Sequence, residues 1–155
     1  MKVLQGMFAA LAALAAAQGS AATVKWDFET GDLQGWKVVD GAFEVVVSDR
    51  EVMHHFPDRK YVKGGKWFMS TLETKRGVPD DGQRGVIESP TVRLTGPKIS
   101  FKIGGGRNSC FFALIDRATG RELARATGDN DQPLVDKSWN VPQAVGKDVF
   151  FRVVD

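Results

Sequence analysis

The sequence predicts an all-β protein folded as an antiparallel β-sandwich with a jelly-roll arrangement of strands. Between Lys98 and Ile103, apolar and polar side chains alternate, which is typical of a strand with one buried face. The run from Cys110 to Ile115 is apolar on both faces, so we expect it in the middle of the core. After the N-terminal segment, short strand patterns and turn signals follow one another without a convincing helical period.

The first 22 residues are predicted to be a secretory signal peptide. Lys2 precedes an apolar run from about Met7 to Ala17, and small residues follow up to Ala22. The run is shorter than the ~20 apolar residues that a membrane span needs. We therefore expect cleavage after Ala21 or Ala22 and a secreted, periplasmic or extracellular domain, residues 23–155, that does not insert into a membrane. An uncleaved anchor or a buried helix is the alternative.

The mature chain is predicted to contain some ten short strands. They are expected at about 24–28, 36–39, 42–47, 66–72, 85–94, 98–103, 110–115, 121–126, 139–141 and 148–154. Turns are predicted at Asp40-Gly41, at Thr95-Gly96-Pro97, at the glycines 104–106 and before Gly120. Long polar connections are expected at 48–65, 73–84 and 127–138.

Composition excludes several classes of partner. The chain has 155 residues, enough for one domain with a sizeable core, and its formal net charge is only +2. This balance gives no electrostatic reason to expect nucleic acid or an anionic membrane surface as a partner. Cys110 is the only cysteine, so no intrachain disulfide can form, and we interpret it as a small buried hydrophobe because no base beside it would activate a thiol.

Three pieces of the sequence together carry a resemblance to a known module. They are WDFETGDLQGW (26–36), GVIESPTVRLTGPKISFKIGGG (85–106) and WNVPQAVGKDVFFRVVD (139–155). In this order and spacing they resemble the galactose-binding-like β-sandwich module found beside sucrose- and fructan-hydrolysing glycosidases and in secreted multi-domain bacterial proteins. The resemblance covers nearly all of the mature chain. It implies a jelly-roll sandwich with a non-catalytic binding or spacer role.

The sequence departs from this module at its end. Members usually continue after Val153-Val154-Asp155 with a Gly-Trp-Gly-His-type turn and one more strand. The resemblance therefore implies either a fragment of a longer protein, with a C-terminal continuation or neighbouring domain, or a sandwich that closes one strand short. A missing strand would expose a sheet edge, which favours association.

Loop positions indicate where a ligand could bind. Consecutive antiparallel strands reverse direction, so alternate connections gather at one end, and this count places Asp40-Gly41 and the loops 73–85, 104–109 and 127–138 together. The glycines at 104–106 would allow a ligand to approach the backbone closely, and planar polar groups suit sugar hydroxyls. The candidate ligand-binding residues at this end are Asp80, Asp81, Arg84, Arg107, Asn108, Asp129 and Asn130, with Asp131 beside them. The alternative is that these are ordinary solvated loop residues.

The opposite end is predicted to carry the loop 48–65 and the start of the strand at Trp67. There Tyr61 and Trp67 could form a stacking surface for a sugar ring. Trp26, Trp36 and Trp139 alternate with polar neighbours, so we assign them to the core instead.

No cofactor is predicted, although structural calcium is an option. His54 and His55 would point to opposite faces of a strand, and no cysteine or further histidine completes a zinc set. Asp129, Asn130 and Asp131, and separately Asp27, Glu29 and Asp32, supply the hard oxygens that calcium prefers. The triple glycine is followed by a strand and not by a helix, which excludes a phosphate-binding loop of the nucleotide type.

The sequence therefore predicts a secreted, non-catalytic module that binds carbohydrate or tethers a neighbouring domain to it. A structural or protein-interaction domain without a small ligand is the first alternative. Part of a glycoside hydrolase is the second, and it is disfavoured because Glu44, Glu73 and Glu88 are scattered over strands and loops, with none in a recognisable catalytic context.

Overall fold

Antiparallel strands form the framework of the protein in the computed structural model, which describes residues 23–107 and 109–155. The predicted signal peptide, residues 1–22, and the candidate ligand residue Asn108 lie outside the described residues. The strands are β1 (Lys37–Ala42), β2 (Val47–Ser48), β3 (Phe68–Met69), β4 (Arg84–Glu88), β5 (Val92–Arg93), β6 (Lys98–Gly105), β7 (Phe111–Asp116), β8 (Glu122–Ala126), β9 (Asp131–Asn140) and β10 (Asp148–Val154). One 3-10 turn, η1 (Pro142–Ala144), precedes β10, and the described part of the chain has no α-helix. It accordingly contains no helix long and apolar enough to cross a membrane.

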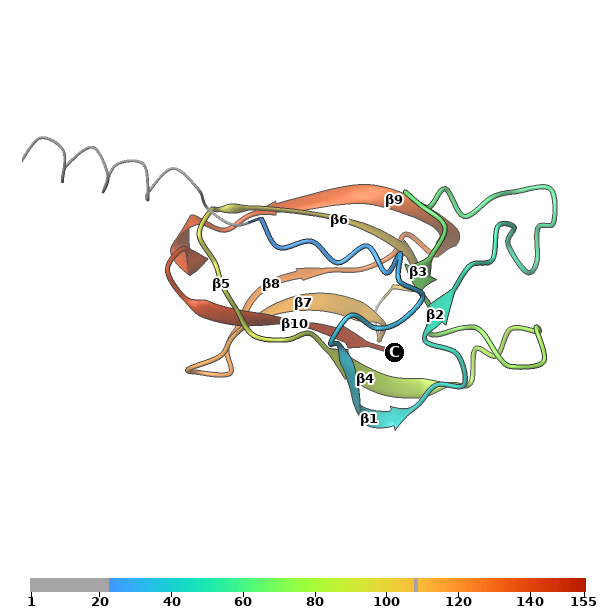
Figure 1. Cartoon of the computed structure of the whole chain (residues 1–155), viewed down its shortest axis with the longest axis horizontal. Helices are drawn as coiled ribbons and strands as arrows, with labels where there is room; N and C mark the ends of the chain where they lie inside the picture. Colours follow the sequence, from blue (N-terminus) through green and yellow to red (C-terminus); the bar gives the residue numbers. More distant parts are fainter. Residues whose placement is uncertain (1–22, 108) are drawn as a thin grey trace, which may run out of the picture.

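The larger layer of the sandwich is a six-stranded sheet in the order β1-β4-β10-β7-β8, with β5 paired to β10 (Figure 1). β10 lies at its centre, where Phe151 pairs with Leu114 of β7 and Val153 pairs with Ile87 of β4. The predicted strands at 110–115, 121–126 and 148–154 are confirmed as β7, β8 and β10. The predicted strand at 85–94 is interrupted, because Pro90 cannot donate a main-chain hydrogen bond and separates β4 from β5.

The smaller layer consists of β6 and β9, which pair antiparallel with Ile99 opposite Trp139. β6 confirms the alternation read from the sequence. β9 was missed, since its first eight residues were assigned to a polar connection. Its polar side chains Asp136, Ser138 and Asn140 are exposed on the outer side, while Trp139 packs on the core, so pairing with β6 overrides the low strand propensity of this segment.

Other sequence assignments were wrong in whole or in part. Of the predicted strands 42–47 and 66–72, only Ala42, Val47, Phe68 and Met69 lie in strands. Residues 24–28 form no strand, although the predicted alternation holds for side-chain direction and Trp26 and Phe28 pack against the core. Asp40-Gly41 is not a hairpin turn but part of β1, next to a shift in register between Val38 and Asp40. Gly41 has a φ of 68°, and a Cβ there would come within 2.1 Å of the carbonyl oxygen of Arg84, so only glycine allows this close pairing with β4.

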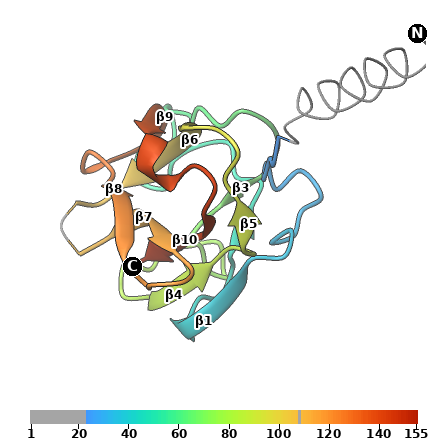
Figure 2. The same ribbon diagram turned by 90° about the vertical axis from the view of Figure 1, so that its left-hand side faces the viewer.

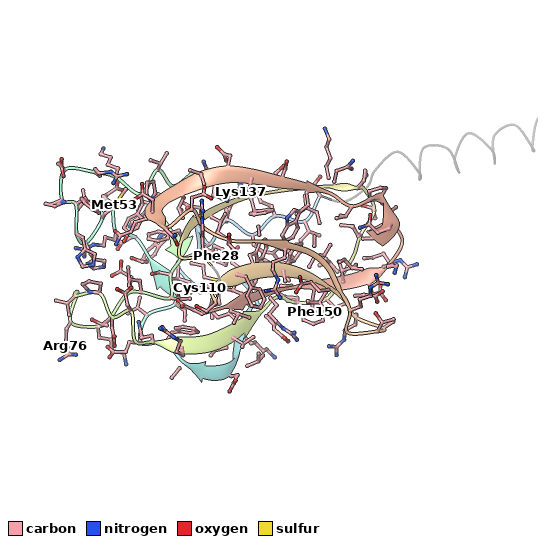
Figure 3. All side chains as sticks on the ribbon, turned by 180° about the vertical axis from the view of Figure 1, so that it is seen from behind. Phe28, Met53, Arg76, Cys110, Lys137 and Phe150 are labelled. Carbon is pink, nitrogen blue, oxygen red and sulfur yellow. The ribbon has the colours of Figure 1, made fainter. Side chains whose placement is uncertain are left out.

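The main core lies between the two layers. Trp36, Leu114 and Phe151 are buried at its centre, and Trp26 contacts Trp36 and Phe151 edge-on, with ring centroids 5.5 and 5.8 Å away. The other face of the large sheet carries a second cluster, Ala113, Ile115 and Phe150. A third cluster joins Met53, Tyr61 and Phe68 beneath the loop 49–65. This loop and the loop 73–83 project from one end of the sandwich, where Figure 3 labels Met53 and Arg76.

Candidate functional site

A cleft of about 950 Å³ opens between the two layers. One wall is β6, which contributes consecutive residues from Ile99 to Gly105. The opposite wall is the N-terminal segment from Val24 to Glu29. This segment lies on the side of β6 that faces away from β9 (Figures 1 and 2), so the cleft lies along the unpaired edge of β6. Figure 3 shows Phe28 between the two layers.

The inner part of the cleft is apolar, and we call it the apolar slot. Its walls and floor are Trp26, Phe28, Trp36, Ile99, Phe101, Ile103, Phe112, Phe151 and Val153. Phe101 and Phe112 meet edge-on with centroids 4.9 Å apart. The indole N–H of Trp36 is buried and has no acceptor among residues 23–107 and 109–155. An uncapped buried donor is unusual and marks a place where a further polar group would be stabilising.

The outer part of the cleft, at the end of the loops, is polar, and we call it the polar rim. It consists of Trp67, Asp81, Arg84, Asn130, Asp131, Gln132 and Asp155. Four residues predicted for ligand binding, Trp67, Asp81, Arg84 and Asn130, thus line the same cleft although they come from three distant parts of the sequence. Asp80, Arg107 and Asp129 lie outside its lining. Asp80 accepts a hydrogen bond from the N–H of Gly82 at 2.8 Å and so shapes its own loop.

Asp155 anchors one side of the polar rim. Its main chain exchanges two hydrogen bonds with Gly85, at 2.9 and 3.0 Å. Its carboxylate accepts hydrogen bonds from the hydroxyl of Thr71 at 2.5 Å and from Sγ of Cys110 at 3.0 Å, while Arg84 lies 3.8 Å away. Burial raises the pKa of the Cys110 thiol, and the Asp155 carboxylate adds to this effect, so the thiol stays protonated. Cys110 is thus partly buried and hydrogen-bonded to a carboxylate, whereas the sequence indicated a small buried hydrophobe without a neighbouring base.

At the glycines 104–106, the main chain at the end of β6 packs directly against the main chain that leads into β9. A Cβ on Gly104 would lie 2.6 Å from the carbonyl oxygens of Gln132 and Pro133, and one on Gly128 would lie 2.2 Å from that of Gly105. Glycine is therefore required here by the crossing of β6 and the chain that enters β9. Gly104 therefore packs against the protein's own backbone, whereas a Cβ on Gly105 would meet nothing within 4 Å. All three glycines line the cleft, so the expectation that they let a ligand approach the backbone stays a prediction.

Asn130 holds the rim loop in place. It adopts a φ of 59°, in the left-handed region that asparagine tolerates, and its N–H donates to the carbonyl of Gly105 at 2.9 Å. Its side-chain oxygen accepts the N–H of Arg107 at 2.9 Å. Asp129 lies 2.9 Å from Lys137 and 3.7 Å from Arg107, and the Lys137 ammonium keeps the pKa of Asp129 below its usual range.

The loop 48–65 was assigned to the wrong end of the molecule. Arg59 pairs with Asp131 of the rim at 2.8 Å, and Nε2 of His54 lies 2.9 Å from Oε2 of Glu73 in the loop 73–83. All these loops therefore gather at one end. Counting the reversals of strand direction along the sequence assigned this loop to the wrong end because residues 24–28 form no strand and β2 and β3 have only two residues each.

The two aromatic residues proposed for stacking have different environments. Tyr61 is only 5% exposed and packs on Phe68, with ring centroids 4.9 Å apart, so it offers no face to a ligand and that assignment is wrong. Trp67 is half-buried on the rim. The Glu29 carboxylate positions it by accepting its main-chain N–H at 3.0 Å, and this bond together with that of Lys66 keeps the pKa of Glu29 below its usual range.

The carboxylates proposed for calcium are engaged with protein groups. Asp27 accepts from the Gln34 side chain at 3.0 Å, which with other bonds keeps its pKa far below the usual range, and Asp32 accepts from Thr30 and from the Gln34 N–H. Asp131 is neutralised by Arg59. Over the described chain, no three His, Cys, Asp or Glu side chains come together in a metal-binding arrangement.

Sequence reasoning did not select Gln132 or Asp155 for the site, and it named Glu29 only as a possible calcium ligand. Gln132 has a buried side-chain oxygen without a hydrogen-bond donor in the described ranges, and it lies on the rim. Their positions in the sequence could have indicated them, because Glu29 follows a predicted strand and Asp155 follows the apolar run of β10. Polar residues at strand ends are frequent in binding sites.

Comparison with known proteins gives one partial similarity. Over 75 residues, 48% of this chain, the sequence is 29% identical to an Aspergillus rugulosus protein named "Putative glycosyl hydrolase ecdE". The match spans 11% of the length of that protein. No protein-family model matches the chain, and no solved structure gives a significant match.

Proposed function

We propose that the chain is a non-catalytic, secreted module that binds carbohydrate at the polar rim, as an accessory to a larger carbohydrate-processing protein. The observation that carries this proposal is the gathering of Trp67, Asp81, Arg84 and Asn130 along one cleft. The accessible part of a half-buried indole can stack on the apolar face of a sugar ring, and planar amide, carboxylate and guanidinium groups can bond its hydroxyls. The similarity to a protein named as a glycosyl hydrolase is consistent with this context.

Two carboxylates that line the cleft, Glu29 and Asp131, have a charge state suited to binding. Glycoside hydrolysis by paired carboxylates needs a general acid whose pKa is raised. The pKa values of Glu29 and Asp131 are instead lowered, that of Glu29 by the main-chain N–H groups of Trp67 and Lys66 and that of Asp131 by Arg59. Carboxylates held in the ionised form by such partners are suited to accepting hydrogen bonds from sugar hydroxyls.

Affinity electrophoresis against plant, algal and microbial polysaccharides tests the proposal, followed by calorimetry with the best binder. We expect weak binding that Trp67→Ala and Arg84→Ala each reduce by about tenfold or more, equivalent to ~1.4 kcal/mol. Matched controls are Phe56→Ala, an exposed loop aromatic outside the cleft lining, and Arg93→Ala, an exposed arginine of β5. Binding that the control variants reduce as much as the rim variants, or no binding across the glycan set, would refute the proposal.

A further inference from the structure

The cleft is one cavity with two unlike ends. Its outer end, the polar rim, carries the indole of Trp67, the carboxylate of Asp81 and the guanidinium of Arg84, whereas the side chains of the apolar slot are all aromatic or aliphatic. The cleft volume of about 950 Å³ lies within the range of about 300–1,000 Å³ that is typical of small-molecule pockets. A cavity of this shape is complementary to one molecule with a polar end and an apolar end.

The protein's own side chains do not fill the apolar slot. Ile99, Phe101 and Ile103 are the inward-facing residues of β6, yet each is only half-buried. Trp26 and Phe28, on the opposite wall, are half-buried as well, although they pack against the core. Protein interiors are normally close-packed, so inward-facing apolar side chains that stay accessible mark space for further apolar atoms.

The side chains of the slot favour a flat aromatic ring over a flexible chain. The rings of Trp36, Phe151 and Phe112 form a stack, with neighbouring centroids 6.2 and 5.4 Å apart and planes inclined by 26° and 12°. Trp26 and Phe101 meet this stack edge-on. A further aromatic ring can join such an assembly by either geometry and gains more than its buried area alone would give.

The slot also contains a polar atom that needs a partner. Trp36 is only 7% exposed, and its indole N–H has no acceptor among residues 23–107 and 109–155. An unpaired buried donor is unfavourable, so an oxygen on the ligand would be stabilising beside it. Phe151, whose ring stacks on Trp36, precedes the rim residue Asp155 by four residues, about 13 Å along an extended strand. The oxygen is therefore expected at the inner end of the ligand.

The charge on the polar rim favours a neutral outer end. Arg84 is the cation of the rim, and its guanidinium donates to the carbonyl groups of Asp81 and Gln83 and lies 3.8 Å from the Asp155 carboxylate. A carboxylate or phosphate on the ligand would need a cation without such partners. Hydroxyl groups both donate and accept, so they suit carboxylates, amides and guanidinium groups alike.

We propose that the cleft binds an aryl glycoside, with its sugar at the polar rim, its aromatic aglycone in the apolar slot and an oxygen of that aglycone accepting the indole N–H of Trp36. Because the sugar occupies the rim, this proposal rests on the function proposed above. It goes further by naming the class of ligand, since an unsubstituted sugar chain has no aromatic group to place in the slot.

Calorimetry and NMR titration of the full chain with three soluble probes test the proposal. The probes are methyl, para-acetylphenyl and para-isopropylphenyl β-glucoside, and the same set is repeated as β-galactosides. The two aryl groups are nearly equal in size, and only the acetyl group adds an acceptor at the far end. We expect both aryl probes to bind about tenfold or more tightly than the methyl glycoside, because their ring is removed from water. Only the acetyl probe should move the indole N–H resonance of Trp36 downfield, as a new hydrogen bond does.

A matched pair of variants places the aromatic ring. Ile103→Lys puts a charge into the slot and should abolish the advantage of the aryl probes while leaving the methyl glycoside bound as before. Val135→Lys is the control, because Val135 pairs with Ile103 across β6 and β9 but is 39% exposed and lies outside the lining of the cleft. This control variant should bind all three probes like the parent chain.

Two further variants place the sugar and the hydrogen bond. Trp67→Ala should weaken binding of all three probes by the same factor, because they share the sugar. Trp36→Phe removes the indole N–H and should weaken binding of the acetyl probe about threefold to tenfold more than that of the isopropyl probe. The Trp36 resonance reports the same bond in the unmodified chain, so this step does not depend on the stability of the variant.

The results that would overturn the proposal differ from those that refute glycan binding. Aryl probes that bind no more tightly than the methyl glycoside, or an acetyl probe that behaves like the isopropyl probe toward Trp36, would refute the aryl glycoside and leave glycan binding at the rim standing. Aryl probes that bind equally well to Trp67→Ala, or that the corresponding free phenols match, would remove the sugar from the rim and refute both proposals.

Discussion

β7 and β6 face each other across the core, yet identical side chains on them differ in burial. Ile115, on the outer face of β7, is 3% exposed, whereas Ile99 and Ile103, on the inner face of β6, are only half-buried. β7 has β10 on one side and β8 on the other, and β6 has β9 alone among the strands of the described chain. The depth of burial is therefore set by the number of neighbouring strands and not by the side chain itself.

Both faces of β7 are also covered. On the inner face Leu114 belongs to the main core, and on the outer face arginine side chains lie over aromatic rings. The guanidinium of Arg125 lies 3.6 Å from the ring centroid of Phe111, and those of Arg117 and Arg152 lie over Phe150 at 5.7 and 5.4 Å. The long stems of these arginines shield apolar surface that would otherwise face water. The larger layer is thus complete, and the smaller layer is not.

The largest expected effect comes from making the same substitution on the two strands. Ile115→Ala removes a fully buried side chain and should lower the free energy of unfolding by about 3–4 kcal/mol. Ile103→Ala removes one that already contacts solvent in the cleft, and the loss should be about 1 kcal/mol. Urea denaturation monitored by tryptophan fluorescence measures both. Equal losses would show that β6 is as well covered as β7, and the contrast between the layers would then fail.

The second effect concerns the loop end, where a buried contact between a histidine and a carboxyl group supplements a small apolar cluster. The side chains of His54 and Glu73 are only 2% and 6% exposed and connect the two projecting loops. The atoms are close enough for an ion pair but are not aligned as a hydrogen bond, and Oε1 of Glu73 has no hydrogen-bond partner in the described part of the chain. Stability of this end therefore depends on one buried polar contact as well as on the apolar cluster.

His54→Ala should destabilise the protein by about 2 kcal/mol, because it leaves the buried Glu73 side chain without the polar group that lies beside its Oε2 atom. The adjacent His55 is exposed, so His55→Ala should change stability by less than about 0.5 kcal/mol. Thermal unfolding of the two variants side by side measures the difference. A His54→Ala variant as stable as His55→Ala would mean that Met53, Tyr61 and Phe68 alone hold the loops.

The same contrast explains what could be predicted from the sequence. The strands β6, β7, β8 and β10 were predicted because their side-chain patterns are local and strong. β9 was missed because its outer face is polar over several residues and its strand state depends on pairing with β6, a contact that no local pattern records. The segment 24–28 shows the reverse case, since its alternation places Trp26 and Phe28 correctly although no neighbour completes a ladder.

The candidate site was predicted in part. Trp67, Asp81, Arg84 and Asn130 were selected as polar or aromatic loop residues, and the cleft unites them. Tyr61 could not be recognised as buried, because its burial depends on Phe68 and on the folding of its loop against β9, where its carbonyl accepts the N–H of Leu134. The cleft itself was not predicted, since it arises from a difference in width between the layers.

The smallest expected effect is a difference between the two layers in how strongly one carboxyl group of each makes stability depend on pH. Asp116, at the end of β7, is 5% exposed, and the Lys147 ammonium, 2.9 Å away, keeps its pKa below the ordinary value of 3.8. Asp131, at the start of β9, is about half exposed, and Arg59 lowers its pKa in the same direction. A carboxyl whose pKa is lowered on folding stabilises the native state above its unfolded pKa, and this contribution is lost as the pH falls through the lower, folded pKa.

Stability should therefore decline as the pH falls below about 4, and the slope of that decline should become shallower in Asp116→Asn. In Asp131→Asn the slope should change less, because water screens the exposed pair, and 1 M salt should remove most of the remaining difference. Urea midpoints measured between pH 2 and pH 7 for the parent and both variants give these slopes. If Asp131→Asn flattened the profile more than Asp116→Asn, the start of β9 would be the better-protected position, and the smaller layer could not be the open one.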